Sequence, residues 1–207
     1  MPQEPPPESA DCPRVALVDA NVLFAPRLRD LMIHLHMARV IHMHWTRDIE
    51  REWTRNVIGK GKADPGAVAQ CLEGMRLAVP GWEVSGYERH IERFDAIHPK
   101  DRHVATAAFQ LATGDWSGRT VGLITKNLRD FPARAFASTG VRRLAPGPYL
   151  DRLYDMAPKA LQAVDETCRQ KLRRPPVDPQ SYVDILIHHQ CSALARAMAR
   201  VWSVRSP

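Results

Sequence analysis

The sequence predicts an α/β protein of the three-layer α/β/α kind, with a mainly parallel five-stranded sheet and a C-terminal helical extension. Short, continuous apolar runs such as residues 15–18 suit strands that are buried on both faces. Segments with apolar residues at helical spacing separate these runs. Strands that alternate with helices are typical of a parallel sheet covered by helices on both faces.

The expected strands follow the apolar runs in chain order, at residues 15–18, 40–45, 82–84, 120–125 and 141–144. Pro26 suits the first turn of a helix, Thr46 is a good N-cap, and Gly114 follows the end of an Ala-rich segment. With the apolar spacing, these signals place helices at residues 26–38, 47–57, 66–77, 88–94 and 102–112, and a short one from Asp130 to Gly140.

The character of the chain changes after Pro146. A helix is expected at residues 149–172 with a break at Pro158, then a Pro-rich linker at 173–179, and a final helix capped by Ser181 and reaching about residue 201. The predicted organisation is therefore a disordered lead at residues 1–13, an α/β domain at 14–146 and a helical extension at 147–207.

Composition and charge restrict the function. The chain has 207 residues, 44% of them hydrophobic and 25% charged, as in soluble globular proteins. No apolar run approaches the roughly 20 residues that span a bilayer, and the N-terminus lacks a signal-peptide pattern, so we expect a cytoplasmic protein without a membrane partner. Residues 141–207 carry 11 Lys or Arg against 6 Asp or Glu. This surplus would attract RNA or an acidic protein, although a solvated helix face explains it equally well.

Four acidic residues stand where predicted elements begin or end, or on a helix face: Asp19, Glu52, Asp101 and Asp130. Ligands of parallel sheets bind outside the carboxyl ends of the strands, and Asp19 follows such an end. A cluster of carboxylates repels itself unless cations neutralise it, so a divalent metal ion, Mg²⁺ or Mn²⁺, is expected there. Each acid also has a simpler interpretation: Asp19, Asp101 and Asp130 as turn or cap residues, and Glu52 as part of a solvated helix face.

Four segments together resemble a PIN domain. They are Val18-Asp19-Ala20-Asn21-Val22-Leu23, Trp45-Thr46 with Glu52 six residues after Thr46, Asp101-Arg102-His103-Val104-Ala105-Thr106-Ala107-Ala108, and Ile124-Thr125-Lys126-Asn127-Leu128-Arg129-Asp130-Phe131-Pro132. Each motif alone is weak, but their order and spacing are fairly specific. The resemblance covers residues 14–146, and the helical extension looks like that of one PIN subfamily.

The resemblance implies a metal-dependent ribonuclease, many of which are VapC-type toxins neutralised by a cognate antitoxin protein. The family's three best-defined acids match Asp19, Glu52 and Asp101, and the Thr46 spacing selects Glu52 over Glu50. Many members have Thr-x-Asp where this chain has Thr125-x-Asn127, so Asp130 is the candidate for the fourth acid. Asn21, Thr125 and Asn127 would orient carboxylates or waters around the metal, and Lys126 and Arg129 would contact substrate phosphates. A homodimer is left open.

Two alternatives compete with the nuclease. A haloacid-dehalogenase-like phosphatase needs a second aspartate two residues after the first, and Asn21 occupies that position, where it cannot serve as a carboxylic acid. A non-catalytic RNA-binding or regulatory module would follow if Asn127 has weakened metal binding. His103 could approach the acidic residues or simply face solvent, and we do not expect it to have a catalytic role.

Overall fold

The computed structural model describes residues 11–172 and 175–207 and contains one parallel sheet. Its strands lie in the order β2-β1-β3-β4, with bounds His42–His44, Val15–Val18, Val121–Ile124 and Val141–Leu144. The α/β prediction is thus confirmed, but the sheet has four strands and not five. Residues 82–84 form only an isolated bridge, in which Trp45 pairs with Glu83. The segment cannot extend, because Gly86, at φ 70°, turns the chain into a 3₁₀ helix.

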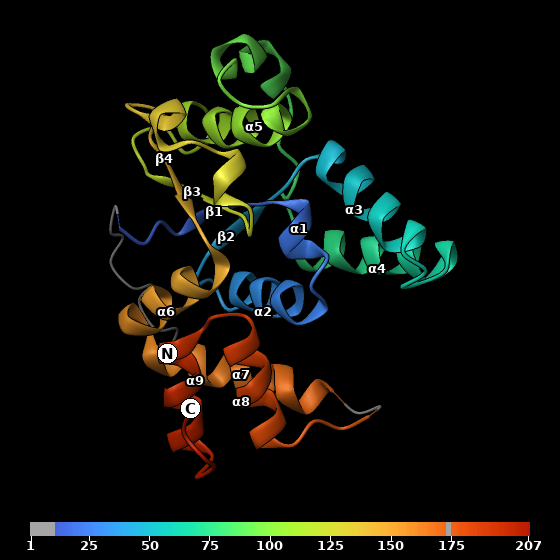
Figure 1. Cartoon of the computed structure of the whole chain (residues 1–207), viewed down its shortest axis with the longest axis vertical. Coiled ribbons are helices and arrows are strands. Elements are labelled where there is room, and N and C mark those ends of the chain that lie inside the picture. Colours follow the sequence, from blue (N-terminus) through green and yellow to red (C-terminus); the bar gives the residue numbers. More distant parts are fainter. Residues whose placement is uncertain (1–10, 173–174) are drawn as a thin grey trace.

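Helices separate the strands much as predicted (Figure 1). Thr46 caps α3, since its Oγ1 accepts a 3.1 Å hydrogen bond from the Ile49 N–H. The expected helices at 88–94 and after Asp130 are 3₁₀ turns instead. The elements of this part are α1 Ala20–Leu23, α2 Pro26–Met37, α3 Arg47–Gly59, α4 Pro65–Ala78, η1 Tyr87–Phe94, η2 Pro99–Asp101, α5 Arg102–Thr113, η3 Leu128–Asp130 and η4 Ala133–Phe136.

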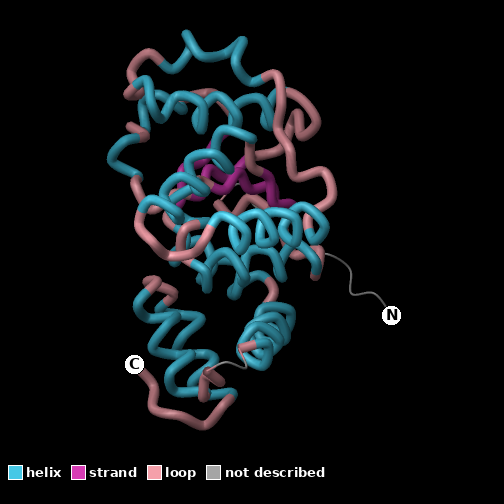
Figure 2. Tube along the Cα trace, turned by 90° about the vertical axis from the view of Figure 1, so that its right-hand side faces the viewer, coloured by secondary structure: helices cyan, strands magenta, loops and turns pink. Residues whose placement is uncertain are grey.

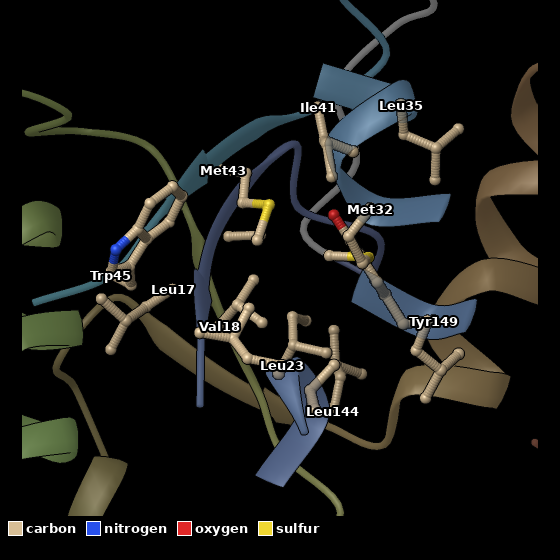
Figure 3. Close-up of a cluster of buried hydrophobic side chains, with 14 of the residues drawn as sticks. Leu17, Val18, Leu23, Met32, Leu35, Ile41, Met43, Trp45, Leu144 and Tyr149 are labelled. Atoms are coloured by element: carbon tan, nitrogen blue, oxygen red, sulfur yellow. The ribbon is translucent and has the colours of Figure 1, made fainter. Parts of the chain in front are cut away.

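The sheet lies between helices on both sides (Figure 2). All four residues of β1 and all four of β3 are buried, as their continuous apolar runs predict. α5 packs on these two central strands, and α2 packs against β2. Side chains from β1, β2 and α2 fill the core on one side of the sheet (Figure 3), including Val18, Met32, Leu35 and Met43. The central strands are thereby fixed, and the residues that follow them are held in place.

The C-terminal extension contains α6 Pro146–Met156, α7 Pro158–Lys171, α8 Pro179–His188 and α9 Ser192–Val201. A break before Pro158 is present, but the single final helix from Ser181 is two helices. Asp178, not Ser181, caps α8, because its carboxylate accepts from the Ser181 N–H at 3.0 Å. Gln190, at φ 63°, turns the chain between α8 and α9. A Cβ on Gly147 would lie 2.4 Å from the Gln190 carbonyl oxygen, so this turn packs directly on the start of α6.

The extension packs on the α/β part through α2 and α7. Tyr149 of α6 also donates a 2.9 Å hydrogen bond to the carbonyl of Pro13. Residues 1–10 of the predicted disordered lead and residues 173–174 of the linker lie outside the described residues, whereas Cys12 is buried. All four cysteines are described, and each is unpaired. In the described residues, no helix is long and apolar enough to cross a membrane.

Candidate metal centre

Asp19 lies at the carboxyl end of β1, in the middle of the sheet, and its side chain is buried. Its Oδ2 accepts a 2.6 Å hydrogen bond from the Asn21 amide and a 2.7 Å bond from the Thr125 hydroxyl. Although it precedes α1, its carboxylate makes no capping hydrogen bond among the described residues. Burial raises the pKa of Asp19 to about 6, against the effect of the Thr125 bond, and the charge of Glu52 raises it further.

Asn21 and Thr125 connect Asp19 to the loop after β3. The Asn21 Oδ1 accepts a 2.9 Å hydrogen bond from the Lys126 N–H, and the Thr125 hydroxyl accepts a 3.0 Å bond from the Asn127 N–H. These two polar residues therefore fix both the carboxylate and the loop beside it. The structure brings them to the place that the sequence assigned to them.

Glu52 reaches the same region from α3. One third of its side chain is exposed, and its Oε2 lies 3.7 Å from the Nε2 of His103. That distance is longer than a hydrogen bond, so the contact is mainly electrostatic. The contact with His103 holds the pKa of Glu52 below its usual value, against the effect of burial. Most of the His103 side chain is buried, so of the two positions open to it the structure has the one beside the acidic residues.

Asp101 ends the 3₁₀ turn η2 and directly precedes α5. Within the described structure, its carboxylate makes no capping hydrogen bond to the helix, so capping does not account for its position. Burial raises the pKa of Asp101, the charge of Lys100 lowers it, and the charges of Asp130 and Glu52 raise it. The Lys100 ammonium lies 3.9 Å from the Asp101 Oδ2.

Asp130 lies at the end of η3 and takes a hydrogen bond on Oδ2 from the Asn127 amide. Arg143 of β4 fixes this turn, because its guanidinium donates to the carbonyls of Leu128, at 3.0 Å, and Phe131. Asp130 is therefore presented on a turn that the sheet itself anchors. It is not the N-cap of η4, which is Pro132.

The charges of the four acids affect one another in pairs. The charge of Glu52 acts on both Asp19 and Asp101, and the charge of Asp130 acts on Asp101. Two of these carboxyl groups have raised pKa values, as expected where negative charges share a partly buried space. Asp19 and Asp130 thus come from the chain after β1 and β3, Asp101 from the start of α5 and Glu52 from α3, and the charges of neighbouring members of this set act on one another.

The donor chemistry of this region suits a hard divalent cation, which prefers carboxylate oxygens. The Asp101 Oδ2 and the His103 Nδ1 are buried and have no hydrogen-bond partner among the described residues. An unsatisfied buried carboxylate oxygen beside other carboxylates is the kind of atom that a cation would satisfy. As the side chains stand, however, no three His, Cys, Asp or Glu groups in the described ranges are arranged to hold an ion. Asp130 instead accepts a hydrogen bond from Asn127, so metal binding requires this side chain to adjust.

Basic residues border the acids. Lys126 and Arg129, the predicted substrate contacts, are both exposed on the loop after β3. Sequence reasoning missed Lys100 and Arg55, whose charges lower the pKa of Glu52. Both positions were readable signals, because Lys100 directly precedes Asp101 and Arg55 lies one helical turn from Glu52 on α3.

Comparisons with protein-family models, with curated proteins and with solved structures found no match.

Proposed function

We propose that this chain is a metal-dependent endoribonuclease with a PIN-like fold. The observation that carries the proposal is the buried Asp19 carboxylate at the carboxyl end of β1, which Asn21 and Thr125 hold and which lies close enough to Glu52 for that charge to raise its pKa. A phosphodiester is an anion, and a purely acidic site would repel it. The site therefore needs cations to bind such a substrate, and the arrangement of oxygen donors favours Mg²⁺ or Mn²⁺.

Asp19, Glu52 and Asp101 would hold one or two ions, with Asp130 at the border of the site. A bound Mg²⁺ or Mn²⁺ supplies an activated water and neutralises charge on the phosphoryl oxygens. Asn21 and Thr125 hold the Asp19 carboxylate in one orientation, which matters because misplaced ligands lose affinity. The exposed Lys126 and Arg129 would bind phosphates of the RNA on either side of the cleaved bond.

The test is cleavage of labelled RNA by the purified chain, with Mg²⁺ and with EDTA. Cleavage should require the metal, and Asp19→Asn should reduce it by more than about a hundredfold, since outer-sphere changes alone cost about 10–100-fold. The exposed Asp115 supplies a matched control, Asp115→Asn, which should cleave normally. If the correctly folded Asp19→Asn variant cuts RNA at the wild-type rate, the site is misassigned.

We further propose that the nuclease acts in the cytoplasm as the toxin of a toxin–antitoxin pair, with an antitoxin protein as its partner. The PIN-like motif order supports this. Induced expression in a bacterial host should arrest growth for the wild-type chain and not for Asp19→Asn. The partner would be identified by a small open reading frame directly upstream that encodes a protein with an N-terminal DNA-binding segment and an acidic C-terminal tail. A homodimer is the assembly to look for in solution.

A second candidate is a non-catalytic RNA-binding module, which the present hydrogen bond between Asn127 and Asp130 favours. Calorimetry separates the two proposals, because an absence of heat at millimolar Mg²⁺ would favour the binding module. A phosphatase of the haloacid-dehalogenase kind fits less well. Asn21, at the position of its general acid, donates a hydrogen bond to Asp19 and has no acidic proton to give.

A further inference from the structure

His103 occupies a place among the acids that the proposed nuclease chemistry leaves without a role. It lies in the first turn of α5, two residues after Asp101, and only 17% of its side chain is exposed. Its Nε2 is directed to Glu52, at 3.7 Å from Oε2. Its charge also acts on Asp19. The imidazole therefore contacts Glu52 and lies close enough to Asp19 to affect its pKa.

Glu52 is the proposed ligand that most needs positioning. Its side chain has three rotatable bonds and is one third exposed, so fixing it costs conformational entropy. Asp19, in contrast, is buried and held by two hydrogen bonds. In the described part of the chain, the Glu52 side chain makes no hydrogen bond and no ion pair other than the contact with His103.

We propose that His103 is a positioning residue that holds the Glu52 carboxylate in place for the divalent ion of the nuclease site. The inference rests on the proposed function. A carboxylate has two oxygens, and a ligand carboxylate commonly coordinates through one while a neighbouring donor holds the other. Here Nε2 of the imidazole lies 3.7 Å from Oε2, so Oε1 is the oxygen through which Glu52 would coordinate the ion. The nitrogen facing the carboxylate carries the proton in this arrangement, because a lone pair there would repel the oxygen.

The rigid ring suits this role. His103 is held by the backbone of α5, which packs on the central strands β1 and β3, so its position is fixed relative to Asp19. Without the ring, Glu52 would be free to turn toward solvent or toward the charges of Arg55 and Lys100. The expected consequence is weaker metal binding, since the entropy of ordering Glu52 would then oppose it.

The experiment measures Mn²⁺ affinity by calorimetry on the full chain without RNA, at one pH above the ordinary pKa of histidine. His103→Asn is too short to reach Glu52, whereas His103→Gln places an amide N–H near the position of Nε2. We expect H103N to weaken Mn²⁺ binding by about 10–100-fold, as changes to residues that orient metal ligands do, and H103Q to remain within about threefold of the wild type. His188, exposed on α8, provides the control His188→Ala, which should bind normally.

The free energy of unfolding, measured in urea without metal, separates positioning from a structural role. A merely structural histidine would lower stability in both variants and leave their metal affinities equal. Equal affinities of H103N and H103Q, or tighter binding by H103N, would overturn this inference and leave the nuclease proposal intact. An absence of Mn²⁺ binding by the wild-type chain would overturn both.

Discussion

The hydroxyl of Thr125 donates a 2.7 Å hydrogen bond to Oδ2 of Asp19, across 106 positions of the chain. The two residues meet because β1 and β3 are parallel neighbours, with Val18 opposite Ile124, and each residue directly follows its strand. The same hydroxyl accepts the Asn127 N–H at 3.0 Å. One side chain thus fixes both the most buried acid of the site and the loop that carries Asp130.

Replacing this hydroxyl by a methyl group, in Thr125→Val, should weaken Mn²⁺ binding by about 10–100-fold, because Asp19 loses a group that orients it. The Asn127 N–H also loses its acceptor, so the free energy of unfolding should fall by about 1–2 kcal/mol. Calorimetry and urea unfolding measure the two effects. Thr125→Ser keeps the hydroxyl and should restore the affinity, and equal affinities of the Val and Ser variants would contradict the assignment.

Asn127 stands where many PIN domains carry an acid, and its amide donates to Asp130. In Asn127→Asp, two carboxylates would face each other, so the melting temperature without metal should fall. Added Mg²⁺ should then raise the melting temperature more than it does for the wild type, since the ion binds a site of greater negative charge. Asn127→Ala loses the hydrogen bond without adding charge. An equal Mg²⁺-induced rise in the Asp and Ala variants would show that residue 127 is remote from the ion.

Glu50 and Glu52 lie on different faces of α3 and have different partners. Glu50 is buried and accepts from the Trp45 indole at 3.0 Å and from the Arg76 Nε at 2.9 Å. Glu50→Ala should therefore lower the free energy of unfolding by about 1–3 kcal/mol, because the buried Trp45 indole loses its acceptor while the partly exposed Arg76 can still be hydrated.

Glu52→Ala should change the free energy of unfolding by less than about 1 kcal/mol, since the side chain is partly exposed and its one contact is long. It should nevertheless abolish metal-dependent RNA cleavage. Urea unfolding measures the stability of the two alanine variants, and the RNA-cleavage assay measures their activity. Comparable destabilisation by the two alanine variants would mean that Glu52 is a structural residue as well.

The central strands could be predicted because burial on both faces leaves a readable apolar run, as in residues 15–18. The segment 82–84, Trp-Glu-Val, was also expected to be a strand, but in the described structure its only pairing is the bridge of Glu83 with Trp45. The final helix was predicted too long because its apolar spacing continues through the turn at Gln190. That turn packs on Gly147, a tertiary contact that local sequence does not reveal.

The candidate site was predictable where it depends on strand ends and less so where it depends on tertiary contacts. Asp19 and Thr125 follow from the strands. The role of Arg143, which anchors the turn of Asp130, was not predictable because its acceptors are backbone carbonyls. The burial of His103 likewise requires α3 and α5 to be placed in space.

Asp165 of α7 has no signal in the sequence that marks it, yet it is fully buried. Its Oδ1 accepts a 3.1 Å hydrogen bond from the Tyr182 hydroxyl of α8, and its Oδ2 has no partner in the described structure. Burial raises the pKa of Asp165 from 3.8 to about 7, against the effect of the Tyr182 bond. The neighbouring Cys168 thiol, whose pKa burial raises to about 12, stays protonated over this range.

This acid should make the stability of the chain depend on pH. The folded state holds the Asp165 proton more tightly than the unfolded chain, so its contribution to the free energy of unfolding is fully present below pH 3.8. That contribution declines as the pH rises to about 7 and is absent above it. The decline should be of the order of a few kcal/mol, at roughly 1.4 kcal/mol for each unit of pKa shift.

Asp165→Asn isolates this effect, because the amide oxygen can still accept from Tyr182 but the side chain no longer ionises. Urea unfolding measured from pH 3.8 to about 7 should show a steeper loss of stability with rising pH in the wild type than in the variant. The effect of Asp165 is the difference between the pH profiles of the wild type and the variant, since Asp19 also has a raised pKa and contributes to both profiles. Parallel pH profiles of the two proteins would mean that Asp165 keeps an ordinary pKa, through water or a rearrangement that reaches its second oxygen.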